Sequence, residues 1–186
     1  FGISAFAIGW IMAGGKLTKA LTQGFFGTLT DQWGHRHYFV ATGALLYAAG
    51  TAAIPLAAVA DGAINPVELT LLPGSQELGG AFFVLFAAYS LLGIADSIRL
   101  PASMSLFVDE GTRYDSVASA ISLRSVSWKV GQTAGPVIIG LAMDTVSTEA
   151  GFLLAAGLIF LSTVGFVITS RRAWASPQPA QPAPGD

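Results

Sequence analysis

The stretch Gly27-Thr-Leu-Thr-Asp31-Gln-Trp-Gly34-His35-Arg36-His37 decides the fold of this chain, because it is a short polar turn between two long apolar segments. Residues 5–30 lead into it with two lysines and otherwise mostly apolar or small side chains. Residues 38–60 follow it with no charged residue at all. Two apolar segments joined by a charged turn are typical of a hairpin of membrane-spanning helices.

The composition of the whole chain indicates an all-α protein that crosses the bilayer several times. Hydrophobic residues make up 53% of the 186 residues and charged residues 11%, whereas a soluble domain has roughly 25% charged residues. The mean hydropathy is +0.63. The 22 glycines suit helices that pack closely in lipid. The sequence contains no cysteine, which excludes disulfides and cysteine metal sites.

The apolar runs predict five transmembrane helices, at about residues 5–30, 38–60, 80–108, 116–143 and 151–170. An acidic loop at 61–78 separates the second helix from the third, and its middle, 67–72, is expected to be a short interfacial segment. Residues 173–186 are rich in proline and are expected to form a disordered tail. The chain starts at Phe1 without the pattern of a signal peptide, so we expect a fragment that lacks a preceding helix.

The basic residues of the short loops predict the orientation in a cell membrane. Those outside the expected spans lie in the loops 31–37 and 109–115 and in the C-terminal tail, and they are Arg36, Arg113, Arg171 and Arg172. The segments on the other side, 1–4, 61–78 and 144–150, contain no lysine or arginine. By the positive-inside rule, the first set is cytoplasmic.

Six ionisable side chains lie within the expected spans, all on the first, third and fourth helices: Lys16, Lys19, Asp96, Arg99, Arg124 and Lys129. A charge at the bilayer centre costs about 2.5–3.5 kcal/mol on insertion scales. We therefore expect these three helices to border a common polar cavity, and the second and fifth helices, which have no charge, to face lipid.

Simpler interpretations exist for some of these charges. Lys16 and Arg99 can extend to a membrane boundary, and Asp96 can pair with Arg99 three residues later on the same helix. Lys129 lies too deep in its helix for such an explanation at 1.5 Å per residue. On the first helix, Lys16, Lys19 and Gln23 share one face.

Two motifs resemble signatures of the major facilitator superfamily. Gly27-x-x-x-Asp31-x-x-Gly34-x-Arg36 resembles the cytoplasmic loop signature G-x-x-x-D-R-x-G-R-R, and Gly131-x-x-x-Gly135-Pro136-x-x-x-Gly140 is similar to the glycine-proline signature of a later helix. The resemblance covers residues 1–172. It implies a transporter built from two six-helix halves that rock about a central site, with this chain as most of one half and the missing half as its partner.

The two motifs differ in how closely they follow the family. Gln32 and His35 stand where the loop signature has basic residues. This weaker loop, followed by a tail after the last span, favours the C-terminal half, and an N-terminal half is the alternative. In the other motif, Gly131, Gly135 and Gly140 leave a bare helix stripe and Pro136 permits a bend, which plain helix packing also explains.

The candidate gating residues lie at two expected helix ends: Gly27, Asp31, Gly34, Arg36, Asp109 and Glu110. The resemblance implies that Asp31 contacts a helix N-terminus of the other half and holds the outward-facing state. Arg36 is expected to pair with Asp109 or Glu110. An exposed ion pair contributes only about 0–1 kcal/mol, which suits a gate that must open.

These observations favour a secondary transporter that moves a small solute through the lipid bilayer by alternating access. The candidate residues that line its cavity are Lys16, Lys19, Gln23, Asp96, Arg99, Arg124, Lys129 and Gln132. Five of these are basic and one is acidic, which favours an anionic solute. One alternative is a proton-coupled exporter of drugs or metabolites that uses Asp96, and another is a membrane scaffold subunit that transports nothing.

Enzymatic and nucleic-acid functions have little support. The sequence has no phosphate-binding loop motif and no pairing of a nucleophile with a base. His35 and His37 would bind a metal only with a third ligand, for which Asp31 is the sole near candidate, so we predict no metal and no cofactor. Lysine and arginine are few and mostly intramembrane, which argues against nucleic acid as a partner.

Overall fold

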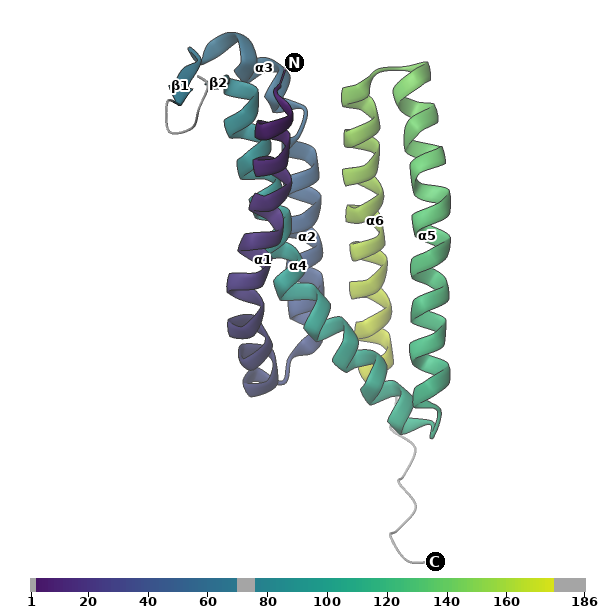
Figure 1. Cartoon of the computed structure of the whole chain (residues 1–186). Helices are drawn as coiled ribbons and strands as arrows, with labels where there is room; N and C mark the ends of the chain where they lie inside the picture. The colour runs from purple at the N-terminus through teal and green to yellow at the C-terminus, as the bar shows by residue number, and fades with distance from the viewer. Residues whose placement is uncertain (1–2, 70–75, 176–186) are drawn as a thin grey trace, which may run out of the picture.

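The computed structural model describes residues 3–69 and 76–175 as a set of long helices with one small β-hairpin (Figure 1). The elements in chain order are α1 (Ala5–Trp33), α2 (Arg36–Ala53), α3 (Leu56–Ala63), β1 (Val67–Leu69), β2 (Gln76–Leu78), α4 (Gly80–Arg113), α5 (Val117–Thr145) and α6 (Thr148–Ala175). This all-α arrangement is that of a polytopic membrane protein, as the apolar runs predict.

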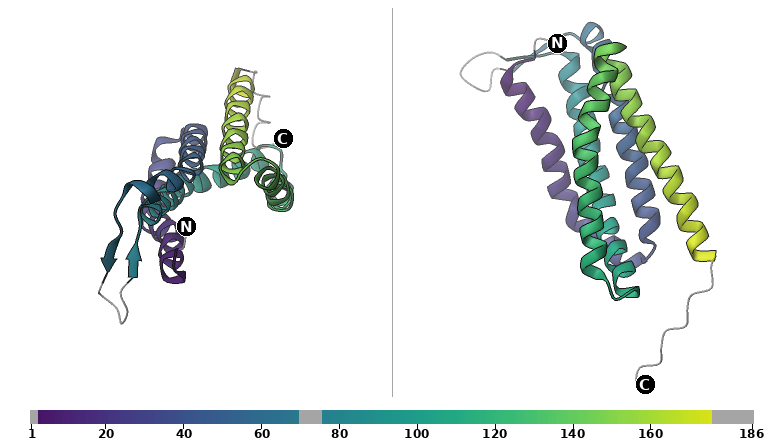
Figure 2. Two further views of the ribbon diagram at one scale, coloured as in Figure 1. Left: turned by 90° about the horizontal axis from the view of Figure 1, so that it is seen from above. Right: turned by 90° about the vertical axis from the view of Figure 1, so that its right-hand side faces the viewer.

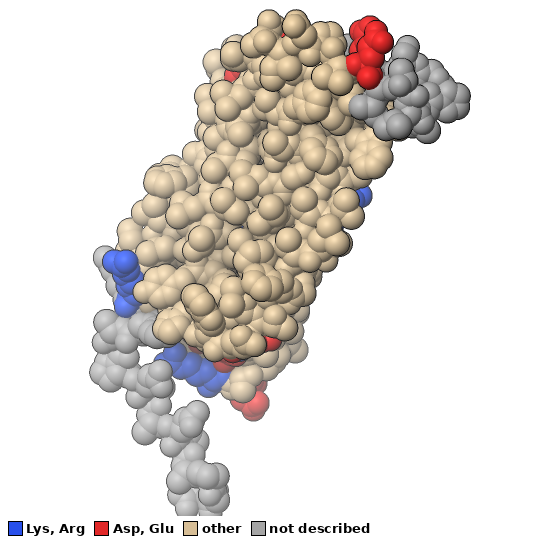
Figure 3. Space-filling view, turned by 90° about the vertical axis from the view of Figure 1, so that its left-hand side faces the viewer, with Lys and Arg blue, Asp and Glu red and all other residues tan. Residues whose placement is uncertain are grey.

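The long helices alternate in direction, so their connections gather at two ends of the molecule. The α1–α2 turn, the α4–α5 turn and the C-terminal end of α6 lie at one end, which we call the turn end (Figure 1). The β-hairpin, α3 and the α5–α6 turn lie at the other end. On the face shown in Figure 3, the charged side chains lie mostly near the two ends and the broad middle is almost entirely uncharged.

Length and composition identify some of these helices as membrane spans within the described residues. Helix α4 and residues 148–171 of α6 qualify by themselves, and α2 with α3 forms a third if the bent pair is one span. Helices α1 and α5 are each 29 residues long but do not meet the hydropathy test. They carry four of the six charges expected inside spans, and α4 carries the other two.

Helix α4 lies at the centre of the packing between α1 and α2. Its buried alanines recur every seven residues, at Ala81, Ala88, Ala95 and Ala102, and none exposes more than 3% of its surface. A seven-residue spacing keeps small side chains on one face of a helix. Neighbouring backbones can therefore approach closely, as helices in lipid require.

The contact between α1 and α4 depends on small and hydroxylated residues. A Cβ atom added to Gly93 would overlap the carbonyl oxygen of Gly15. The Thr18 hydroxyl donates to the carbonyl oxygen of Ser90 at 3.0 Å, and the Thr22 hydroxyl donates to the Ser97 hydroxyl at 2.8 Å. These interhelical bonds satisfy hydroxyl groups that lipid would leave unpaired.

Helix α2, which the sequence predicts to face lipid, also packs against α4 and α6. A Cβ on Gly43 would lie 2.9 Å from the carbonyl oxygen of Ala95, and one on Gly50 would lie 2.9 Å from Leu92 Cδ2. Glycine at these two positions lets α2 approach α4 closely. A helix without charge therefore contributes to the interior as much as to the lipid-facing surface.

The expected helix 38–60 is broken near Pro55 into α2 and α3, which are bent by 48°. Proline has no backbone N–H to donate, so the ladder of hydrogen bonds is interrupted there. Beyond α3, the segment expected to be interfacial begins as strand β1, in which Val67 pairs with Leu78 and Glu68 with Glu77 of β2. The rest of that expected segment, residues 70–72, lies outside the described residues.

Several helices extend beyond the ends of their apolar runs. Helix α1 ends at Trp33, where Gly34 has a φ of 65° and closes the helix with a bond to the Thr30 carbonyl. Glycine adopts this left-handed conformation without strain. Helix α4 continues to Arg113, so most of the expected loop 109–115 is helical. Helix α6 includes residues 173–175 of the expected tail, and residues 176–186 lie outside the described part.

Helices α5 and α6 form a pair beside the group of α1, α2 and α4, and the tilted α4 connects the two sets (Figures 1 and 2). Helix α5 packs against α4 and α6, yet none of its residues is buried. Much of its surface therefore has no covering element within the described residues.

Candidate functional site

A carboxylate of α4 binds two cations from two helices. Asp96 accepts a hydrogen bond from Arg99 Nε at 2.9 Å, and its Oδ1 lies 2.8 Å from Arg99 Nη2. The Lys19 ammonium of α1 lies 3.5 Å from Asp96 Oδ2. The pairing of Asp96 with Arg99 on one helix, given above as the simpler interpretation, is therefore present, and it also includes a lysine from a neighbouring helix.

Tyr47 of α2 contacts the same group of charges. The Arg99 guanidinium carbon lies 4.7 Å from the centroid of the Tyr47 ring, close enough for a cation–π interaction. Arg99 is thus held between a carboxylate and an aromatic face, and its orientation is fixed by two helices. The sequence analysis missed Tyr47. Its signal is faint, since it is an uncharged aromatic residue among small and apolar neighbours.

A hollow of about 270 Å³ lies next to these charges. Its lining residues come from α1, α4 and α5, and they are Lys19, Asp96, Leu100, Arg124, Ser125 and Trp128. Arg124 makes no ion pair within the described residues. The structure therefore brings together four of the predicted cavity residues: Lys19, Asp96 and Arg124 line the hollow, and Arg99 pairs with Asp96 beside it.

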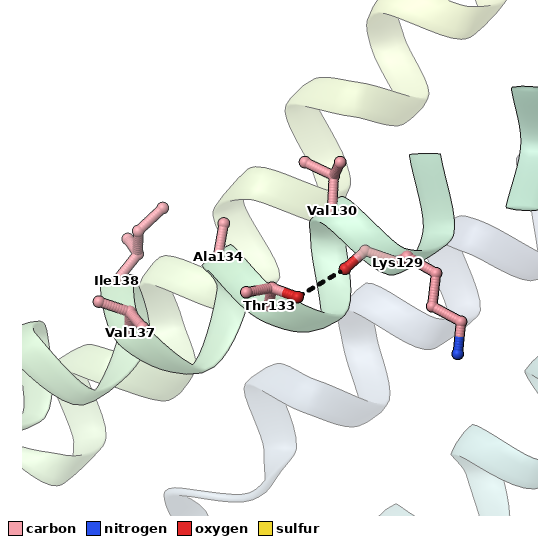
Figure 4. Close-up of a pocket in the computed structure, with 6 residues that line it drawn as sticks. All are labelled: Lys129, Val130, Thr133, Ala134, Val137 and Ile138. Atoms are coloured by element: carbon pink, nitrogen blue, oxygen red, sulfur yellow. Dashed lines mark hydrogen bonds between the residues drawn. The ribbon is translucent and has the colours of Figure 1, made fainter. Parts of the chain in front are cut away.

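The other predicted cavity residues do not join this hollow. Lys16, Gln23, Lys129 and Gln132 are exposed. Lys129 lies at the edge of a separate, shallow apolar surface of α5, and its ammonium points away from Val130, Ala134 and Ile138 (Figure 4). Lys129 therefore lies within α5, as predicted from the sequence, but does not line the hollow beside Asp96.

The glycine-proline motif faces open space. A Cβ atom added to Gly131, Gly135 or Gly140 would meet no atom within 4 Å. Pro136 lies within α5, which runs unbroken from Val117 to Thr145. Within the described part of the chain, the bare stripe on α5 therefore packs against nothing.

The candidate gating residues form one ion pair between helices. Arg36 at the start of α2 bonds Asp109 near the end of α4, one of its two expected partners. The other, Glu110, lies 3.8 Å from Arg113 on its own helix. Asp31 is exposed and makes no side-chain hydrogen bond or ion pair with the described residues, and a Cβ on Gly27 would likewise meet no atom within 4 Å.

Metal-ligand geometry is absent from the part of the chain that the structure describes, where no group of three histidine, aspartate or glutamate side chains is placed to hold an ion. His35 and His37 lie side by side, with ring centroids 6.3 Å apart.

The chain has the features of a polytopic membrane protein with a polar interior. Its long helices alternate in direction and meet at small residues, and a charged cluster lies beside a hollow between them. A family model for the Major Facilitator Superfamily matches residues 1–185. The chain therefore belongs to this superfamily, whose members are membrane transporters of small solutes and not enzymes. No curated protein and no solved structure matches the chain.

Proposed function

We propose that this chain forms most of one half of a secondary transporter that moves a small anionic solute by alternating access. The observation that supports the proposal is the excess of positive charge around the hollow. Lys19 and Arg124 line the hollow as two cations and Asp96 as the single carboxylate, while Arg99 pairs with Asp96 beside it. An anion that enters the hollow would therefore meet one positive charge more than Asp96 balances on its walls, with Arg99 as a further cation next to Asp96.

The geometry distinguishes the roles of the cations. Arg99 is bound twice by Asp96 and stacked on Tyr47, so it is the least free to move. Lys19 has one longer contact, at 3.5 Å, and its side chain is 33% exposed. The Lys19 ammonium can therefore exchange Asp96 for a solute anion at small cost. Arg124 can bind the anion without breaking any ion pair with the described residues.

The remaining assignments of the proposal concern the complete transporter. Lys16, Gln23, Lys129 and Gln132 would contact the solute or the other half when that half encloses the cavity. The bare stripe of α5 would pack against the other half. The turn end would lie in the cytoplasm, in agreement with its arginines, and Asp31 together with the Arg36–Asp109 pair would stabilise the outward-facing state.

Anion uptake into vesicles containing the complete protein tests the solute assignment. We expect Arg124→Gln to raise the KM for the transported anion roughly tenfold or more, the loss typical of one charge-assisted contact. Arg113→Gln removes the same charge at the turn end and serves as the matched control. Equal KM values for Arg124→Gln and the unmodified protein would contradict the proposal, and unchanged transport by Lys129→Ala would remove Lys129 from the site.

A proton-coupled exporter of drugs or metabolites is the second candidate. It is favoured by one observation, namely that Asp96 is the only carboxylate among the residues lining the hollow. This candidate predicts that Asp96→Asn abolishes the dependence of transport on pH, and a dependence that survives would exclude it. If the complete protein shows no flux of any solute in vesicles, the scaffold interpretation replaces both.

A further inference from the structure

A second hollow, of about 490 Å³, lies between α2, α4 and α6 at the turn end. Its walls are largely apolar and include Val40 of α2, Leu106 and Phe107 of α4, and Phe166 of α6. None of the residues around Lys19, Asp96 and Arg124 lines it. The hollow is therefore separate from the candidate solute site.

A smaller hollow of about 300 Å³ adjoins it, because His37 and Ser170 line both. This second space is lined in addition by His35, Tyr38 and Arg171. The lining of the combined space changes from one end to the other. It is largely apolar inside, includes the Ser170 hydroxyl where the two hollows meet, and has Arg171, His35 and His37 at its mouth. An amphiphile with an acyl chain and an anionic head has the same order of chemistry.

The depth of the mouth agrees with the position of a lipid headgroup. In the sequence, the apolar run of α6 is followed directly by Arg171 and Arg172. The turn end is where α1 joins α2 and α4 joins α5 (Figure 1). Basic pockets between transmembrane helices at this depth bind the headgroups of anionic lipids. A protein embedded in a bilayer is surrounded by this ligand.

The other charges near the two hollows are partly compensated. Glu110 is the carboxylate that lines the apolar hollow, and Arg113 lies 3.8 Å from it. Arg36 and Asp109 pair with each other. Arg171 makes no ion pair within the described residues, so its charge is available to a ligand at the mouth.

We infer that this composite pocket binds an anionic phospholipid, with the headgroup phosphate against Arg171 and His35 and one acyl chain between Val40, Phe107 and Phe166. A free phosphate ion would leave the apolar hollow empty, and a zwitterionic lipid would bring a cationic group, which Arg171 repels, together with its phosphate. The inference concerns a different site from the anion transport proposed above and does not depend on it.

Lipid binding to the full chain tests the inference. Delipidated protein is titrated with fluorescent-tailed phosphatidylglycerol and with the phosphatidylcholine of the same tail, and the ratio of the two affinities is measured. We expect preference for phosphatidylglycerol and a loss of about fivefold in that ratio for Arg171→Gln, the effect of one basic side chain near a headgroup. Lys129→Gln removes a positive charge from the exposed surface of α5, outside both hollows, and should change the ratio less than twofold.

The apolar part of the pocket is tested by a pair of matched substitutions. Val40→Phe fills the hollow and should weaken the binding of phosphatidylglycerol severalfold, while Val126→Phe on the exposed surface of α5 should not. Equal effects of Arg171→Gln and Lys129→Gln would overturn the inference. So would equal affinity for both lipids, or competition by inorganic phosphate as effective as that by the long-chain lipid. A normal melting temperature of each variant shows that a loss of binding is not a loss of fold.

Discussion

At the scale of single residues, Asp96 is the group on which the others of the cluster depend. It neutralises one cation of its own helix and one of α1, and its side chain is only 22% exposed. A cation left without a partner in such a place keeps its cost of dehydration but loses its attraction. Removal of the carboxylate should therefore be worse than removal of either cation.

Asp96→Asn is expected to destabilise the fold by roughly 1–3 kcal/mol, below the 3–5 kcal/mol measured when fully buried pairs are broken, because this cluster borders a hollow. Lys19→Gln in the same background should restore part of the loss, since it removes one of the unpaired charges. Thermal unfolding of the purified protein measures both. Asp109→Asn at the exposed turn end is the control and should change stability by less than about 1 kcal/mol.

Tyr47 provides a prediction that separates its ring from its hydroxyl. Tyr47→Phe keeps the aromatic face over Arg99 and should leave the KM for the solute nearly unchanged. Tyr47→Leu removes the aromatic face and should weaken the interaction that holds Arg99 in place by about 0.5–2 kcal/mol. The loss would be seen as a raised KM and a lowered melting temperature. A phenylalanine variant as impaired as the leucine variant would show that the hydroxyl group, and not the ring, matters.

At the scale of elements, glycine controls how closely the helices approach one another. Gly93→Val is expected to destabilise the α1–α4 contact by about 1–3 kcal/mol, the usual cost of overpacking, because its Cβ would overlap the Gly15 carbonyl. Gly157→Val on α6 adds the same side chain where no atom lies within 4 Å and serves as control. Unfolding of the two variants in the same detergent compares them, and equal stabilities would contradict the packing argument.

The elements also show what an apolar pattern can predict. The number and order of the long helices follow from the runs of apolar residues, since each run must cross the same thickness of lipid. Helix ends do not follow from these runs. Residues 109–113 include three charged side chains and are nevertheless helical, because a helix can extend into water while its backbone hydrogen bonds remain intact. The bend at Pro55 and the hairpin after α3 depend on local backbone chemistry that hydropathy does not record.

The candidate site was only partly predictable for a related reason. Charges inside spans mark the helices that border a polar interior, and this rule correctly selected Lys19, Asp96, Arg99 and Arg124 as neighbours. It says nothing of the direction in which each helix is rotated, so it placed Lys129 with them although that side chain points elsewhere. It also passes over uncharged partners such as Tyr47, which an inventory of charges cannot detect.

At the scale of the whole molecule, the cluster and the gating pair act on the same helix, α4. Asp96 ties the middle of α4 to α1, and Asp109 ties its end to α2 through Arg36. Helix α4 also connects the α1–α2 group to the pair of α5 and α6. Its C-terminal half is therefore well placed to transmit movement between that group and that pair. The Arg36–Asp109 pair lies where such a movement would first separate the helix ends.

The last prediction concerns that pair as a gate in the complete transporter. This chain contains no cysteine, so Ser125→Cys, which lines the hollow, can report access through its rate of labelling by an impermeant maleimide added at the turn end. Arg36→Gln should speed labelling by no more than about fivefold, because an exposed ion pair holds a closed state by only about 0–1 kcal/mol. The exchanged pair Arg36→Asp with Asp109→Arg should restore the original rate, as electrostatic attraction does not depend on which helix carries which sign. If both variants label at the unmodified rate, the pair only positions α2 against α4 and has no part in opening the hollow.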